Sequence, residues 1–217
     1  MRTILLLALL LSHSLRAEEV AFQDDFKDGI DKGWTWVRED PKAWRSTSEG
    51  LEIRVLPGNM WGPPNNAKNV LVRELPELAK DRITVSVKVL NKPTEQYEQV
   101  NLVWYFDDSN MVKLGLEQVD KKLCVVMGRE ENDRTRTIAV IPKATPSLQV
   151  RLTVQGKKIE GHYRLDGSDR WLKAGECELP SISSKPKISL QAYQGPDEVE
   201  HWAKITDFKI LRIPESK

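Results

Sequence analysis

The sequence predicts a single all-β domain folded as a sandwich or a barrel. After residue 17, apolar residues do not recur at helical spacing over any long stretch. Short segments of alternating apolar and polar residues recur instead, separated by turn-forming residues. The clearest pair, 99–106 and 111–119, flanks the polar turn Asp107-Asp108-Ser109-Asn110 and is typical of a β-hairpin. Many short strands of this kind favour a sandwich or barrel.

Each expected strand is one of these short alternating segments. In chain order they are 22–26, 51–55, 70–73, 83–89, 99–106, 111–119, 123–127, 137–141, 148–154, 159–165, 188–193 and 205–210. Gln155-Gly156 and Asp166-Gly167 mark tight turns, because glycine readily adopts a positive φ. The first and last segments both alternate, so we expect the terminal strands to pair.

The hairpin predicts one apolar face and one polar face, since successive strand side chains point to opposite sides of a sheet. The apolar side chains are Leu102, Trp104, Phe106, Val112, Leu114 and Leu116, and the polar face carries Gln99, Asn101, Tyr105, Lys113 and Glu117. In the segment 188–193, Ser189, Gln191 and Tyr193 alternate with core-type residues in the same way. The polar side chains of both elements are therefore candidates for binding a polar ligand.

The first 17 residues have the features of a signal peptide. A basic start precedes an apolar run that is too short to span a bilayer, and Ala17 is a small residue at the expected cleavage position. The alternative is an uncleaved membrane anchor. We expect cleavage after residue 17, a secreted or periplasmic protein, and one domain over 18–217 without a further membrane span. The segment 57–68, rich in Gly and Pro, is expected to be a surface loop.

The charge of the chain argues against nucleic acid as a partner. The formal net charge is +1, and removal of Arg2 and Arg16 with the signal peptide changes it to −1. Acidic and basic residues are also interspersed along the sequence, as expected for a solvated surface. A nearly neutral protein lacks the basic character by which proteins bind nucleic acids or anionic membranes.

Two cysteines and three aspartates suggest further sites. Cys124 and Cys177 would enter an oxidising compartment after export, so the sequence leaves open a disulfide or two buried thiols. Asp24, Asp25 and Asp207 would approach one another if the terminal strands pair, and calcium prefers such oxygen ligands. Their spacing matches no calcium-binding loop, so solvated aspartates are favoured and no cofactor is expected.

No complete catalytic motif is present in the sequence. A jelly-roll glucanase aims two or three carboxylates from one strand into its cleft, whereas this chain offers only Glu131-Asn132-Asp133, which is expected to form a turn. Glu176 and Glu178 share a strand face but are expected to be exposed. His162 and His201 are too isolated for a zinc cluster.

The tryptophans of the sequence are candidates for sugar binding. Seven tryptophans occur, and several lie outside strong strand patterns. A flat aromatic face can stack on the apolar side of a sugar ring, while amide and charged side chains hydrogen-bond its hydroxyls. Trp61 is the best stacking candidate, since it lies in the Gly/Pro-rich loop. Core packing is the alternative for each tryptophan.

Several segments together resemble a known superfamily. They are 34–41 with Trp44, 50–54 with Pro57, Gly58 and Trp61, 97–102, 110–117, Asp166-Gly167 with Trp171, 188–192 and 203–208. The pattern resembles the concanavalin A-like lectin/glucanase superfamily, and within it the exported bacterial proteins related to the β-xylosidase C-terminal domain and the group labelled "regulation of enolase".

The resemblance covers nearly the whole chain after the signal peptide and implies a two-sheet antiparallel jelly-roll sandwich whose concave face binds sugars. Relatives often read Asp-Gln-Ala-Gly-Leu at 98–102 and an aromatic residue at Met111, so the identity of the sugar does not carry over.

Three functions are consistent with these features. The first is an exported lectin-like module that binds an oligo- or polysaccharide without catalysing a reaction. Its expected ligand-binding residues are Trp61, Gln99, Asn101, Tyr105, Lys113, Glu117, Gln191 and Tyr193. The second is a glycoside hydrolase with a non-standard acid/base pair, in which the neighbouring Lys113 keeps Glu117 ionised as base or nucleophile. The third is a protein-interaction module of the cell envelope.

Overall fold

The computed structural model describes residues 18–75, 82–142 and 145–213. Within these ranges the chain forms fifteen strands and no helix. The strands are β1 (Glu19–Asp24), β2 (Trp34–Val37), β3 (Trp44–Thr47), β4 (Gly50–Arg54), β5 (Val70–Glu74), β6 (Arg82–Leu90), β7 (Gln99–Asp107), β8 (Asn110–Val119), β9 (Lys122–Glu131), β10 (Arg134–Pro142), β11 (Ser147–Gln155), β12 (Lys158–Leu165), β13 (Leu172–Glu178), β14 (Lys187–Tyr193) and β15 (Trp202–Ile213). The expected signal peptide lies outside the described residues. In the ranges above, no helix has the length and apolar character needed to cross a membrane.

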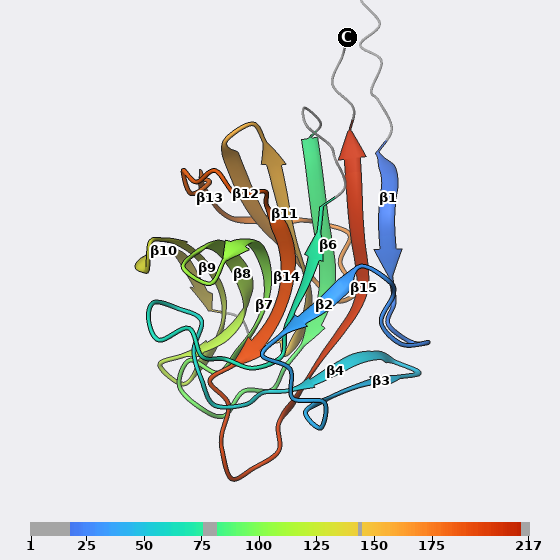
Figure 1. Ribbon diagram of the computed structural model, residues 1–217, viewed down its shortest axis with the longest axis vertical. Helices are drawn as coiled ribbons and strands as arrows, with labels where there is room; N and C mark the ends of the chain where they lie inside the picture. Colours follow the sequence, from blue (N-terminus) through green and yellow to red (C-terminus); the bar gives the residue numbers. More distant parts are fainter. Residues whose placement is uncertain (1–17, 76–81, 143–144, 214–217) are drawn as a thin grey trace, which may run out of the picture.

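The strands form two antiparallel sheets that pack face to face (Figure 1). One sheet has the order β13-β12-β11-β6-β15-β4-β3, with β1 also paired to β15. The other has the order β10-β9-β8-β7-β14-β5-β2. This architecture confirms the predicted all-β, two-sheet antiparallel sandwich. We call the side of the seven-stranded sheet that is turned away from its partner sheet the outer face.

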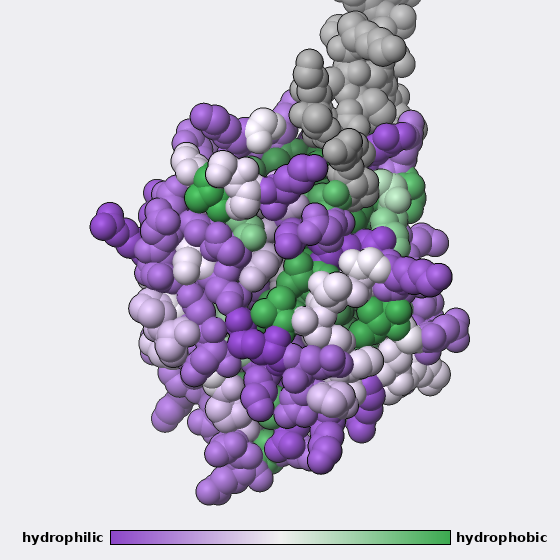
Figure 2. Space-filling model, viewed as in Figure 1, coloured by the Kyte–Doolittle hydropathy of each residue, from purple (hydrophilic) through white to green (hydrophobic). Residues whose placement is uncertain are grey.

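Strand alternation builds the core between the sheets. In the central hairpin, Leu102, Trp104 and Leu114 are almost completely buried and point inward. Val85, Val150 and other buried residues of the eight-stranded sheet meet them. The polar residues between them in sequence point to the outer face, as the sequence predicts. Figure 2 shows mostly hydrophilic residues on the visible surface, with hydrophobic residues in small areas.

The two ends of the described chain are joined in one sheet, as predicted. β1 pairs with β15 so that Asp24 lies opposite Phe208. The Asp24 carboxylate then accepts hydrogen bonds from the backbone N–H of Phe26 at 2.8 Å and from the indole Nε1–H of Trp34 at 3.0 Å. One buried carboxylate therefore anchors the turn after β1 to the start of β2.

The short edge strands β2 and β3 are absent from the sequence prediction, and β13 was indicated only by the shared strand face of Glu176 and Glu178. Each lies at or near the edge of a sheet and is only partly buried. An edge strand that is only partly buried needs fewer apolar residues, so the alternation of apolar and polar residues in its sequence is weak. The predicted turn at Glu131-Asn132-Asp133 is confirmed, with Asn132 and Asp133 both at positive φ between β9 and β10.

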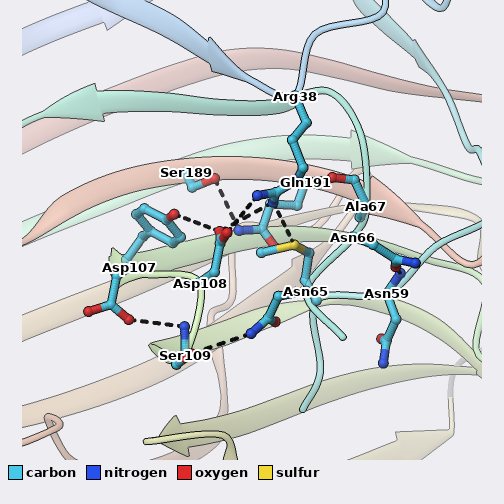
Figure 3. A network of polar contacts seen from close by, with 12 residues as sticks. Arg38, Asn59, Asn65, Asn66, Ala67, Asp107, Asp108, Ser109, Ser189 and Gln191 are labelled. Carbon is cyan, nitrogen blue, oxygen red and sulfur yellow. Dashed lines mark hydrogen bonds and ion pairs between the residues drawn. The ribbon is translucent and has the colours of Figure 1, made fainter. Parts of the chain in front are cut away.

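A loop between β4 and β5 covers part of the outer face. This covering loop (residues 56–68) places Met60 and Ala67 on an apolar area of the sheet formed by Val70, Val72, Val103, Tyr105, Met111 and Tyr193. Arg38, just after β2, donates hydrogen bonds to the carbonyl of Ala67 at 2.7 Å and to Asp108 at 3.2 Å (Figure 3). The expected surface loop is thus held by apolar packing of Met60 and Ala67 on the sheet and by the hydrogen bond from Arg38 to Ala67.

We expect Leu114→Ala to lower the free energy of unfolding by about 3 kcal/mol, because Leu114 is fully buried in the core and the substitution leaves a cavity. Val140→Ala, at an exposed position of β10, is the control and should change it by less than about 0.5 kcal/mol. Urea unfolding measures both. Equal effects of the two substitutions would contradict the assignment of the core.

Candidate binding site

A pocket of about 410 Å³ lies between the covering loop and the strands β7 to β10. We call it the Trp61 pocket. Its walls are formed by Asn59, Trp61, Tyr97, Gln99, Lys113, Glu117, Val119, Val126, Thr137, Val140 and Gln194. Four of the eight residues predicted to bind ligand, Trp61, Gln99, Lys113 and Glu117, therefore meet in one cavity.

Lys113 forms the centre of the pocket floor and is 2% exposed. Its Nζ lies 2.6 Å from Gln99 Oε1, 2.9 Å from Glu117 Oε2 and 4.6 Å from the centre of the Trp61 ring. Burial lowers the pKa of Lys113, and the adjacent Glu117 opposes that change. Two hydrogen bonds and one cation–π contact thus engage the three N–H groups of the ammonium.

Gln99 is a structural connection between strands. Its Nε2 donates to the carbonyl of Tyr97 at 2.8 Å and to Gln194 Oε1 at 3.2 Å. Its Oε1 accepts from Lys113 and from Asn101 Nδ2, the latter at 3.0 Å. An amide has two donor and two acceptor positions, and all four are used here. Gln99 therefore positions Lys113 and has no hydrogen-bonding capacity left for a ligand.

Glu117 is the polar group of the pocket best placed to bind a ligand. Its Oε2 accepts from Lys113, whereas its Oε1 has no hydrogen-bond partner among the described residues. The side chain lines the cavity and is 9% exposed. Glu117 Oε1 is therefore an acceptor for an O–H or N–H group that enters the pocket.

The Trp61 side chain is seated directly on the backbone of β9. A Cβ atom at Gly128 would lie 2.4 Å from Cη2 of the indole, so only glycine leaves room for the ring. Asn59 Oδ1 accepts from the Trp61 N–H at 3.0 Å. The next residue, Gly62, donates its N–H to both carboxyl oxygens of Glu130, at 3.0 and 3.1 Å. These contacts on both sides hold the ring against the sheet.

Glu130 was not among the predicted site residues, and it lies beneath the covering loop. It is fully buried, and this burial raises its pKa from 4.5 to about 7. Glu130 follows Gly128 by two positions on β9, so both face outward. The predicted strand 123–127 ends before them. Continuing the strand alternation from 127 to 130 would have placed Glu130 on the outer face, and this was the one sequence signal for it.

The other four predicted ligand-binding residues do not line the pocket. Asn101, Tyr105, Gln191 and Tyr193 lie on the outer face but are buried. Tyr105 donates to Asp108 Oδ1 at 2.8 Å, and Gln191 Nε2 donates to Ser189 Oγ at 3.2 Å (Figure 3). Burial raises the pKa of both tyrosines. Met60 and Ala67 of the covering loop pack with Tyr105 and Tyr193, so this part of the outer face lies beneath the loop and outside the Trp61 pocket.

The predicted cysteine and aspartate sites are also resolved. Cys124 lies on the outer face next to Glu117, while Cys177 packs against the core from β13. They therefore lie on opposite sides of the seven-stranded sheet and are free thiols. No group of three His, Cys, Asp or Glu side chains suited to a metal occurs in the part of the chain that the structure describes. Asp24, Asp25 and Asp207 line one cavity beside the paired terminal strands, and Asp24 accepts N–H hydrogen bonds there.

The sequence matches the model of the family described as "Protein of unknown function (DUF1349)" over residues 36–208. No curated protein matches the chain.

Solved structures share the fold. The GH43 protein BlXynB from Bacillus licheniformis superimposes with a TM-score of 0.76 at 19% identity, over 88% of this chain and 39% of that protein. The xylan β-1,4-xylosidase from Bacillus halodurans gives a TM-score of 0.71 at 16% identity, over 89% and 39%. A functionally unknown protein from Saccharomyces cerevisiae gives 0.66 at 14% identity, over 84% and 98%. This chain thus spans about two fifths of the length of the two Bacillus proteins.

The contact between Gly128 and Trp61 predicts a coupled pair of substitutions. We expect Gly128→Ala to lower the free energy of unfolding by about 1–3 kcal/mol, because the added methyl group overlaps the indole. In a Trp61→Ala background the same substitution should cost less than about 0.5 kcal/mol. Urea unfolding of the four proteins in this cycle gives the coupling energy. Additive effects would show that the ring does not lie on β9.

Glu130 predicts a pH dependence of stability. Its pKa is higher in the folded protein than in the unfolded chain, so its contribution to stability falls as the pH rises from about 4.5 to about 7. Glu130→Gln keeps an acceptor for the Gly62 N–H but carries no titratable proton. We therefore expect the variant to lose less stability than the wild type between pH 5 and pH 8 in urea unfolding. Identical pH profiles would contradict the burial of an ionisable Glu130.

Proposed function

The chain belongs to the DUF1349 family, and we propose that it is a carbohydrate-binding module whose ligand enters the Trp61 pocket. The observation that supports this most is the pairing of Trp61 with Glu117 Oε1 in one cavity. A sugar ring has an apolar face and a rim of hydroxyls, and it needs such a pair of groups. Glu117 is carried by β8, and the Trp61 ring of the covering loop packs against Gly128 of β9.

The chemistry of the pocket suits a sugar. Val119, Val126 and Val140 add apolar surface, and Tyr97 stands half-exposed at its edge. A sugar stacked on this surface would donate a hydroxyl to Glu117 Oε1. Because Gln99 and Lys113 are already fully engaged, the strands beneath the sugar need not rearrange, which lowers the entropic cost of binding.

The GH43 neighbours guide the choice of sugar. One is named as a xylan β-1,4-xylosidase. Since this xylosidase and the present chain share the β-sandwich, we propose β-1,4-linked xylo-oligosaccharides as ligands of the present chain. We propose export as well, on the basis of the signal-peptide features of residues 1–17.

Binding is favoured over hydrolysis by the carboxyl groups near the pocket. A glycoside hydrolase needs two carboxyls that flank the scissile bond. Glu117 lines the pocket, but the neighbouring Glu130 is fully buried with both oxygens on the Gly62 N–H. Glu176 and Glu178 are exposed on β13, and Glu176 pairs with Lys158. Among the described residues, the pocket lining contains one carboxyl group, that of Glu117.

The proposal predicts that Trp61→Ala weakens binding of xylohexaose at least tenfold, because the stacking surface is lost. Isothermal titration calorimetry measures the affinity. Trp171→Ala is the matched control, since Trp171 is stacked by Arg151 and Arg164, residues of the other sheet, and should leave the affinity unchanged.

Three outcomes would contradict the proposal. They are no binding of xylohexaose by the wild type, equal loss in both tryptophan variants, and release of xylose that disappears in Glu117→Gln. The last would instead favour the hydrolase.

A further inference from the structure

A second cavity adjoins the Trp61 pocket at the end of the seven-stranded sheet. It is a shallow groove of about 690 Å³ between the covering loop and the segments 95–96 and 194–199. Asn59 and Gln194 line both the groove and the pocket. The two cavities are therefore neighbouring parts of one surface, separated by two amide side chains.

Hydrogen bonds fix the boundary between the cavities. Gln194 Oε1 accepts from Gln99 Nε2, and Gln99 Oε1 accepts from Lys113. Asn59 Nδ2 donates to the carbonyl of Trp61 at 2.8 Å, and its backbone N–H donates to Asn66 Oδ1 at 2.9 Å. The floor of the groove is thus tied to the same network that orients Lys113 and Trp61.

The charges along this surface are of one sign. Glu95, Asp197 and Glu198 line the groove, and no Lys or Arg is among the described residues that line it. Asp197 and Glu198 are exposed. In the pocket the cation is Lys113, which is buried and engaged by Glu117 and Gln99. An anionic ligand would face three carboxylates in the groove without a free cation in either cavity.

We propose that the groove is an extension of the binding site, which accepts the continuing chain of a neutral oligosaccharide and excludes chains that carry carboxylates. This inference rests on the proposed function of the Trp61 pocket. One end of the ligand occupies the pocket, the chain crosses Asn59 and Gln194, and further sugar units lie in the groove. Affinity therefore rises with chain length, and uronic acid polymers are rejected by charge repulsion.

Calorimetry with xylobiose, xylohexaose and trigalacturonate tests the extension. For the wild type we expect xylohexaose to bind at least tenfold more tightly than xylobiose, and trigalacturonate to give no measurable binding. In the double variant Asp197→Lys/Glu198→Lys, trigalacturonate should bind measurably, while xylobiose should keep its wild-type affinity. Asp28→Lys/Asp169→Lys changes the net charge equally at exposed positions outside both cavities and should leave trigalacturonate unbound.

The outcomes separate the two proposals. Equal affinity for xylobiose and xylohexaose would overturn the extension but leave the pocket intact. Gain of trigalacturonate binding in both double variants would overturn the role of the groove carboxylates, because net charge alone would then explain it. Failure of the wild type to bind either xylo-oligosaccharide would overturn the proposed function together with the extension.

Discussion

Burial of the Lys113 ammonium is the interaction on which the candidate site depends. An ammonium removed from water is costly unless oxygen atoms or aromatic rings replace its hydration. Gln99 and Glu117 supply the oxygens from β7 and β8, and Trp61 supplies the ring from the covering loop. The charge therefore connects the sheet to the loop. Because Lys113 is held from several sides, the position of the pocket is fixed by the fold.

The polar residues of the outer face form two groups. Those of the first group bind other groups of the protein, and those of the second are directed at the pocket. Gln99 and Lys113 use their hydrogen-bonding capacity within the protein, and Asn101 and Gln191 are buried and donate to neighbouring side chains. Glu117 Oε1 and the Trp61 ring remain directed at the pocket. A polar strand face is thus a poor guide to ligand contacts until the partners of each side chain are known. Most of its polar groups hold the protein together.

The sequence predicted local structure well because alternation in a strand is a property of adjacent residues. It located the central hairpin and its inward face, the turn at Asn132-Asp133 and the pairing of the terminal strands. It did not predict that the covering loop folds back onto the sheet, since that depends on contacts of Met60 with residues distant in sequence. Glu130 was missed for a similar reason, because its environment is created by the backbone of Gly62. The free thiols required knowledge of which side of a sheet each cysteine occupies.

The proposed function requires a neutral sugar to stack on Trp61. Nuclear magnetic resonance of ¹⁵N-labelled protein tests it most directly, because the indole N–H of Trp61 can be assigned by its absence from the Trp61→Ala spectrum. Titration with xylohexaose should shift this signal and leave the indole signals of Trp104 in the core and Trp171 beside Arg151 unchanged. A titration that leaves the Trp61 signal in place, or that shifts the Trp171 signal instead, would contradict the account.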